Sequence, residues 1–313
     1  MRSCSLPVLV VATSISACGG GGGSSGIKST TPSPATAPST ATQYPSVSTL
    51  TFGYTLSGWA AGYTTDYTSK AFGEVPGGSA TGRINGSASG IQNLTLTVNG
   101  IGGASFSEQF SAADLTTSAA VPGTSATLLS GYKTATDGSV RTLTILDTAS
   151  SSLNYSSLGA WEYAPIAGAT STNAAWFAFG AATRPTDIPL TGTATYNGLM
   201  VGRYADGAAL WTVGATANAA ADFANRSISF NTSDTQLNYQ TVTLAAPTLN
   251  LSGTLSYAAG ANKVTGPLTT PAGLTGTANA QFYGPAAAEL AGAFFVGDGA
   301  NTKQMTGSFG VKR

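Results

Sequence analysis

Apolar and polar residues alternate with a period of two through much of the chain from residue 50 onward. Four segments carry this pattern most clearly: 93–99, 226–231, 250–257 and 276–282. Such alternation is typical of strands with one buried and one solvated face. No run of helical period extends beyond a turn or two. The sequence therefore predicts an all-β fold.

Dipeptides that favour tight turns separate these segments. Asn, Asp and Gly tolerate the positive φ that two-residue hairpins require. The sequence therefore predicts turns at five dipeptides: Asn85-Gly86, Asp137-Gly138, Asn197-Gly198, Asp206-Gly207 and Asp298-Gly299. The stretch 297–301 also has a faint likeness to a calcium loop. Two oxygen-bearing side chains are too few for calcium, so we expect a hairpin turn there.

The composition excludes several classes of function. Charged residues make up 8% of the chain, against roughly 25% in ordinary soluble proteins, and 13 basic residues balance 13 acidic ones. The absence of a basic cluster argues against a nucleic-acid partner. The chain has no histidine, which excludes Ser-His and Cys-His nucleophiles and the usual zinc sites. We predict neither a metal site nor a cofactor.

The amino terminus resembles a bacterial lipoprotein signal. Met1 and Arg2 form a short positive region, and 6–15 is an apolar stretch too short to span a bilayer, which takes about 20 residues. It ends in Ile-Ser-Ala-Cys, which is similar to the lipobox at which a signal peptidase cleaves before the cysteine. Residues 1–18 are therefore interpreted as a lipoprotein signal peptide, and Cys18 as the lipidated residue. An ordinary secretory signal with an incidental cysteine is the alternative.

The residues after Cys18 are interpreted as a disordered tether. The stretch 19–48 is first Gly-rich and then rich in Ser, Thr, Pro and Ala, a composition that cannot bury enough apolar surface to order itself. By resemblance to lipoprotein sorting, Gly19 after the cysteine favours the outer membrane, and we expect display on the cell surface. Several acyl chains on one residue would anchor the protein stably.

Two β-rich units are predicted after the tether. The best internal boundary is 181–189, where two prolines and four polar residues lie between strand-like stretches. It divides 49–182, interpreted as a handle-like β domain, from 185–313. The second unit contains roughly eight predicted strands, the number that closes a small barrel whose interior side chains can fill. The predicted fold is a β-rich handle followed by a soluble eight-stranded antiparallel β-barrel.

Two motifs close the chain. Residues 282–292 read Phe-x-Gly-Pro-x-Ala-x-Glu-Leu-x-Gly, and 307–313 read Gly-x-Phe-Gly-x-Lys-Arg. Both resemble the last strands of the β-barrel domain of transferrin-binding protein B and related surface lipoproteins. The likeness covers 190–313, with 192–198 as a first barrel hairpin, and it is looser over the handle, where 158–162 matches best. The chain departs from the transferrin receptors in having one handle and one barrel, and in being far poorer in charge.

The resemblance implies a binding module and not an enzyme. Its context would be iron or nutrient capture, with the cargo handed to a TonB-dependent outer-membrane receptor. The cargo would be a protein or a small molecule, with haem and an iron-carrier protein as candidates. Within the first closing motif, we expect Gly284-Pro285 to end a strand. Glu289 is expected to bond backbone amides of the turn at 286–288 as a structural cap.

Aromatic residues cluster near the start of the handle. Tyr54, Trp59, Tyr63 and Tyr67 lie among small and polar residues. One interpretation makes them cross-strand pairs over the handle core. The other makes them contacts to a ligand or partner, because Tyr and Trp are the side chains that anchor protein interfaces.

If haem is the cargo, a tyrosine must supply its axial ligand. Haem iron is held by His, Cys, Met or Tyr. The chain has no histidine, Cys18 is expected to be acylated, and Met200 and Met305 are expected to fill the barrel core. The three tyrosines of the aromatic cluster remain as the candidate ligands.

Three other functions stay open. An enzyme could use two of Glu74, Glu108 and Glu162 as an acid and a base, although the four glutamates and nine aspartates are spread singly along the chain. A transmembrane barrel would need an apolar lipid-facing band with aromatic girdles, whereas the predicted strand faces carry Ala, Gly and Thr. The third alternative is a structural or adhesive surface lipoprotein.

Overall fold

The computed structural model describes residues 44–47, 54–87, 90–101 and 104–313. The signal peptide, Cys18 and all of the predicted tether except 44–47 lie outside these residues. The described strands form two nine-stranded antiparallel sheets, and the only helices among the described residues are single 3-10 turns. None of these is long and apolar enough to cross a membrane. The predicted all-β class is confirmed.

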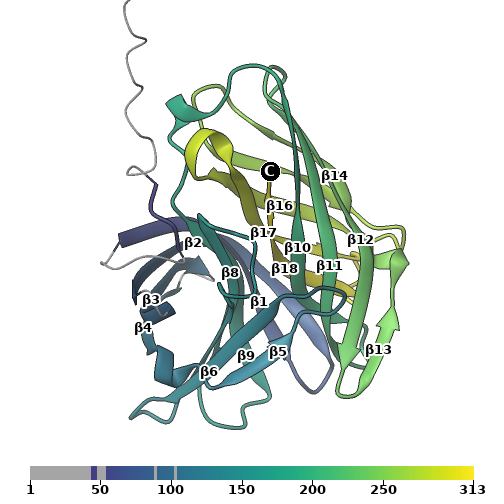
Figure 1. Cartoon of the computed structure of the whole chain (residues 1–313). Helices are drawn as coiled ribbons and strands as arrows, with labels where there is room; N and C mark the ends of the chain where they lie inside the picture. Colours follow the sequence, from purple (N-terminus) through teal and green to yellow (C-terminus); the bar gives the residue numbers. More distant parts are fainter. Residues whose placement is uncertain (1–43, 48–53, 88–89, 102–103) are drawn as a thin grey trace, which may run out of the picture. The chain divides into compact units, whose positions relative to one another are not determined.

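The first sheet, the handle sheet, is a curled half-barrel. Its strands follow the order β4-β3-β2-β1-β9-β8-β7-β6-β5, so β4 and β5 form its two edges. In Figure 1 its purple to teal strands curve around a common interior. Its core includes Leu94, Trp161, Phe177 and Phe179. The strand bounds are β1 Tyr54–Asp66, β2 Ala71–Ser87, β3 Gly90–Ile101, β4 Ala104–Ser111, β5 Thr117–Ala120, β6 Thr127–Thr134, β7 Val140–Leu146, β8 Ser156–Ala164 and β9 Ser171–Gly180.

The second sheet, the barrel sheet, closes on itself. Eight strands run in the order β11-β10-β18-β17-β16-β15-β14-β12, and pairing between β11 and β12 joins the two ends. The predicted eight-stranded barrel is therefore confirmed, and a short ninth strand, β13, pairs within the described ranges with β12 alone. The bounds are β10 Thr193–Ala205, β11 Leu210–Asp222, β12 Ser227–Tyr239, β13 Val242–Ala245, β14 Ser252–Tyr257, β15 Lys263–Thr269, β16 Thr275–Tyr283, β17 Glu289–Gly297 and β18 Gln304–Lys312.

Side chains fill the barrel interior, as expected for eight strands. Met200 and Met305 lie fully buried in this core, where the sequence placed them, together with Phe230 and Phe309. The rings of these two phenylalanines stand 4.4 Å apart. On the outward face of β12, Ser229 is exposed. A polar residue at such a position differs from the apolar band that a lipid-facing strand carries.

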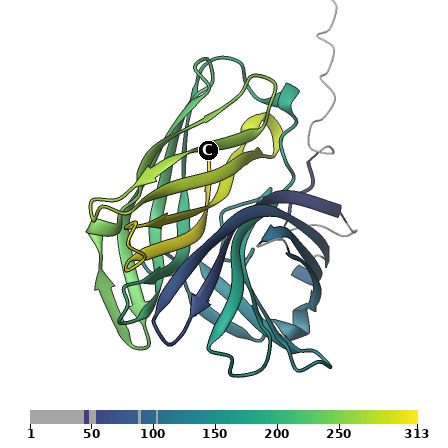
Figure 2. The same cartoon turned by 180° about the vertical axis from the view of Figure 1, so that it is seen from behind.

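The last two strands, β17 and β18, are buried on both faces. One set of alternate residues, including Phe294 and Phe309, fills the barrel. The other set, including Ala291 and Phe295, packs in a cluster with Leu158 and Trp176 of the handle sheet. Figure 2 shows the purple strand β1 running beside the yellow-green barrel strands, where it contacts β16 and β17. The handle sheet therefore covers one side of the barrel wall.

Three of the five predicted turns are confirmed. Gly138, Gly207 and Gly299 each have a positive φ in the turn between two paired strands. The stretch that faintly resembles a calcium loop is a hairpin turn, as expected, and Asp298 lies in it. Its carboxylate accepts hydrogen bonds from the backbone N–H groups of Ala300, Thr302 and Lys303.

The other two turn predictions are wrong. Asn197-Gly198 lies inside the continuous strand β10, so the first barrel hairpin expected at 192–198 does not exist. A Cβ added at Gly198 would stand 2.1 Å from the carbonyl oxygen of Gly310, so glycine is required there by close strand packing. Asn85-Gly86 lies within β2 at a register shift against β3, which marks a bulge and not a turn.

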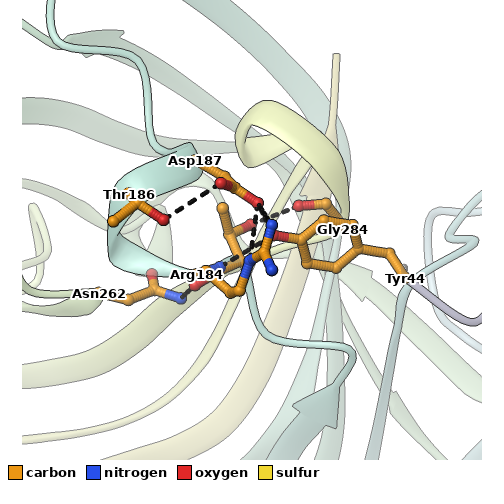
Figure 3. Close-up of polar contacts among 7 residues, drawn as sticks. Tyr44, Arg184, Thr186, Asp187, Asn262 and Gly284 are labelled. Carbon is orange, nitrogen blue, oxygen red and sulfur yellow. Dashed lines mark hydrogen bonds and ion pairs between the residues drawn. The ribbon is translucent and has the colours of Figure 1, made fainter. Parts of the chain in front are cut away.

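The link between the two sheets is held by a polar cluster (Figure 3). Tyr44 donates its hydroxyl hydrogen bond to Asp187, and the guanidinium of Arg184 donates two more to the same carboxylate oxygen at 2.9 and 3.0 Å. Thr183 donates to the carbonyl of Gly284 at 2.6 Å, and Asn262 donates to the carbonyl of Thr183. Tyr44 is thus fixed to the linker, and both Tyr44 and Val47 are buried in the handle core. The prediction of a disordered tether is therefore wrong for 44–47, because these apolar side chains find a core to pack in.

Candidate functional site

Three of the predicted aromatic residues lie on β1, which faces the barrel sheet, and Tyr67 lies in the turn directly after it. Tyr63 is 2% exposed and packs edge-to-face on Phe72, with ring centroids 5.2 Å apart. Trp59 is half-buried, and the ammonium of Lys263 from β15 lies 4.5 Å from its ring centroid. The side chain of Tyr54 lies outside what the structure describes. The described members therefore do not form one exposed aromatic surface.

Tyr67 belongs to a polar cluster that joins the two sheets. Its hydroxyl donates to Glu162 on β8, and Thr172 on β9 donates to the same oxygen at 2.7 Å. The other carboxylate oxygen lies 4.0 Å from a terminal nitrogen of Arg203, which comes from barrel strand β10. Burial, followed by the negative charge of Glu162, raises the pKa of Tyr67. Burial is the main reason why the pKa of Tyr63 is raised strongly.

The three carboxylates proposed for an acid–base pair have separate surroundings. Glu74 is exposed, Glu108 pairs with Arg141 at 3.2 Å, and Glu162 pairs with Arg203. Within the described residues no two of the three share a hydrogen-bond or ion-pair partner. This arrangement gives little support to the enzyme alternative.

A cavity of about 220 Å³ lies beside this polar cluster, between the handle and barrel sheets. A second hollow of about 350 Å³ shares Thr142 and Glu162 with it. We call the first cavity the inter-sheet cleft. The handle contributes Tyr63, Ala119, Ala120, Pro122, Leu128, Ser130, Thr142, Thr144, Ala160, Glu162 and Trp176, and the barrel contributes Gly202, Arg203, Thr212 and Asn238.

Sequence reasoning missed the barrel half of this cleft. Arg203 is the residue that completes the polar cluster, and it stands at an ordinary strand position without a motif around it. Only the pairing of β10 with β18, and the packing of the handle against that wall, bring it to Glu162. No local signal in the sequence carries that information.

A second surface feature, which we call the apolar flap, lies at the β12–β13 hairpin. It consists of Tyr239, Val242 and Leu244, with exposed fractions of 40%, 46% and 46%. The ring of Trp211 packs against that of Tyr239, with the two ring centroids 5.7 Å apart. Because β13 pairs only with β12 in the described part of the chain, its outer edge is free to meet a partner.

Glu289 differs from its predicted role. The turn before it forms as expected, with a 3-10 turn at Pro285–Ala287, but its carboxylate does not cap that turn. It reaches the handle, where it accepts hydrogen bonds from the backbone N–H groups of Asn154 and Tyr155 and from the hydroxyl of Ser156 at 2.7 Å. These two N–H groups belong to the residues directly before β8, so the entry of that strand is bonded to the barrel.

The environment of Glu289 shifts its ionisation. The residue is 1% exposed, and burial raises the pKa of its carboxyl group despite the three donors, which act in the opposite direction. Glu289 is thus a buried polar link between the two sheets.

Comparison with known proteins identifies the barrel. A family model described as the C-lobe and N-lobe β-barrels of Tf-binding protein B matches residues 188–313. This part of the chain belongs to that β-barrel family. Glu289 and its Gly-Pro turn lie within the matched transferrin-binding protein B barrel. No curated protein matches the chain.

Several solved structures resemble the chain at low identity. Transferrin-binding protein B from Haemophilus parasuis is 16% identical with a TM-score of 0.45, and the match covers 81% of this chain and 45% of that one. The isotype 1 protein from serogroup B Neisseria meningitidis is 16% identical with a TM-score of 0.39, covering 76% and 52%. A structure described as a surface lipoprotein is 15% identical with a TM-score of 0.35, covering 51% and 76%. The chain therefore spans about half the length of the first two.

Proposed function

We propose that this chain is a surface lipoprotein of the outer membrane that binds a cargo and presents it to a TonB-dependent receptor for iron or nutrient uptake. The observation that carries this proposal is the transferrin-binding protein B barrel at 188–313. The lipobox-like residues before Cys18 and the low-complexity stretch after it support the anchoring. The 25 residues from 19 to 43 would have a typical end-to-end distance of roughly 30 Å, which leaves the barrel free to meet a receptor beside it.

Replacing the anchor residue tests the location. Cys18→Ser should move the protein from the membrane fraction to the soluble fraction, because no other thiol remains after cleavage to carry acyl chains. Fractionation with palmitate labelling measures this, and Cys4→Ser is the matched control that should change nothing. Unchanged labelling in Cys18→Ser would contradict the lipoprotein assignment.

A protein cargo is favoured over free haem. A tyrosinate ligand needs a phenol that ionises readily, whereas burial raises the pKa of Tyr63, and burial together with Glu162 raises that of Tyr67. Tyr63 lines the inter-sheet cleft, which at about 220 Å³ is smaller than pockets for drug-sized ligands, roughly 300 to 1,000 Å³. The exposed apolar flap, by contrast, offers Tyr, Val and Leu side chains to a protein surface.

Binding measurements with haemin and with purified iron-carrier proteins test this choice. We expect haemin to give no Soret shift, and transferrin or haemoglobin as protein probes to bind the immobilised chain. Leu244→Asp on the apolar flap should weaken that binding at least tenfold, whereas Tyr132→Ser, at another exposed aromatic residue, should not. A high-spin ferric spectrum that is lost in Tyr67→Phe would instead identify haem. If no probe binds, iron capture is wrong.

A further inference from the structure

The guanidinium of Arg203 carries more hydrogen-bond donors than the described residues around it offer acceptors. A guanidinium carries five N–H donors in a planar fork. Among the described residues, its partners are the Glu162 carboxylate, 4.0 Å away, and the Tyr67 hydroxyl. The side chain is 35% exposed and lines the inter-sheet cleft. The remaining donors are therefore available to a ligand in the cleft, and a carboxylate is the group that matches a guanidinium fork best.

The rest of the cleft wall is polar but uncharged. Of the residues that the structure describes, Arg203 and Glu162 are the only charged ones that line it. Ser130 and Thr144 bond one another at 2.9 Å, and Asn238 donates to Thr243 at 3.0 Å. The hydroxyl groups of Thr142 and Thr212 make no side-chain hydrogen bond within the described part of the chain. The wall thus offers hydroxyl and amide groups that can exchange hydrogen bonds with the hydroxyl groups of a ligand.

Charge and size narrow the ligand further. A polyanion would be repelled by Glu162 beside Arg203. A ligand with a single carboxylate can place that group at the guanidinium and turn its own hydroxyl groups toward the Glu162 oxygens. At about 30 Å³ per water, the cleft has room for about seven waters, which is the scale of a monosaccharide.

We propose that the inter-sheet cleft binds a small monocarboxylic acid rich in hydroxyl groups, such as a sugar acid. Arg203 on the barrel holds the carboxylate, while Glu162 and Thr142 on the handle accept and donate hydrogen bonds with the hydroxyl groups. The ligand contacts both sheets and therefore ties the handle to the barrel wall. The cleft shares no residue with the apolar flap, although Asn238 of the cleft bonds Thr243 in the flap hairpin, so binding of the acid and of the protein cargo is measured separately.

Calorimetric titration of the full chain with galacturonate tests the site. Galacturonate should bind, and galactose, which has matching hydroxyl groups without the carboxylate, should bind at least tenfold more weakly. Acetate, a carboxylate without hydroxyl groups, should also bind at least tenfold more weakly. Arg203→Gln should weaken galacturonate binding at least tenfold, and Thr142→Val about threefold or more.

Arg141→Gln is the matched control, because Arg141 is also half-buried and paired with a glutamate but does not line the cleft. Its affinity for galacturonate should equal that of the unsubstituted chain. Should Arg203→Gln fail to fold, Thr142→Val and the comparison of three probes still decide the matter. Three results would each overturn the proposal. Galacturonate fails to bind, galactose or acetate binds as tightly as galacturonate, or the affinity for galacturonate is unchanged in both Arg203→Gln and Thr142→Val. If the unsubstituted chain binds galacturonate but not transferrin, the proposed protein cargo is wrong and the proposed acid site stands.

Discussion

Glu289→Ala is expected to lower the free energy of unfolding by about 3 kcal/mol. The substitution removes the acceptor of two backbone N–H groups and of the buried Ser156 hydroxyl. Each buried donor left without a partner costs roughly 1–3 kcal/mol, and the two N–H groups near the surface regain some water. Chemical denaturation measures the change. Glu108→Ala, which breaks a half-buried ion pair with Arg141, is the control and should cost under about 1 kcal/mol.

The pH dependence of Glu289 gives a second, independent readout. Burial raises its folded-state pKa above the ordinary 4.5, so the folded chain holds this proton more tightly than the unfolded chain. The group therefore adds stability that is complete below pH 4.5 and is lost as the pH rises through the folded-state pKa. The stability of the unsubstituted chain minus that of Glu289→Gln should fall over this window. A difference that rises with pH, or stays flat, would contradict a buried carboxyl group.

The strands could be predicted because their cause is local. In 93–99, alternation of Leu or Val with Asn or Thr produces one buried face, and β3 forms there with Leu94, Leu96 and Val98 buried. Turns were harder to predict, because glycine has two uses. Gly207 has the positive φ of a turn, whereas Gly198 allows β10 to pack closely on β18. A dipeptide alone does not distinguish a turn from a close strand contact.

The contacts between the two sheets could not be predicted from local patterns. The motif around Glu289 was recognised, but its partners at 154–156 lie more than 130 residues earlier in the chain. Likewise, Tyr67 and Glu162 were both singled out, for separate functions, and the fold brings them together with Arg203. Which side chains meet depends on how the handle sheet packs on the barrel wall, and a strand pattern records only which residues are buried.

The fragment 185–313 is expected to fold by itself into the closed barrel. Its core consists entirely of residues from 188 onward, with Met200, Phe230 and Phe309 among them. The β11–β12 pairing completes the hydrogen-bond ladder without any handle strand. Since neither the core nor the ladder depends on the handle, circular dichroism should show a β-type spectrum and thermal melting should be cooperative.

The barrel fragment should nevertheless melt at a lower temperature than the full chain. Removing the handle exposes the outward side chains of Val201, Tyr283 and Phe295, which pack with handle residues in the full chain. Exposing a large apolar side chain costs roughly 1.5–3 kcal/mol, so the loss is on the order of 5 kcal/mol. Glu289, by contrast, regains water. In the fragment, Phe295→Thr should therefore improve solubility without lowering the melting temperature. In the full chain, the same substitution should lower the free energy of unfolding. A fragment that aggregates, or melts without cooperativity even with that substitution, would mean that the handle sheet is needed to complete the barrel.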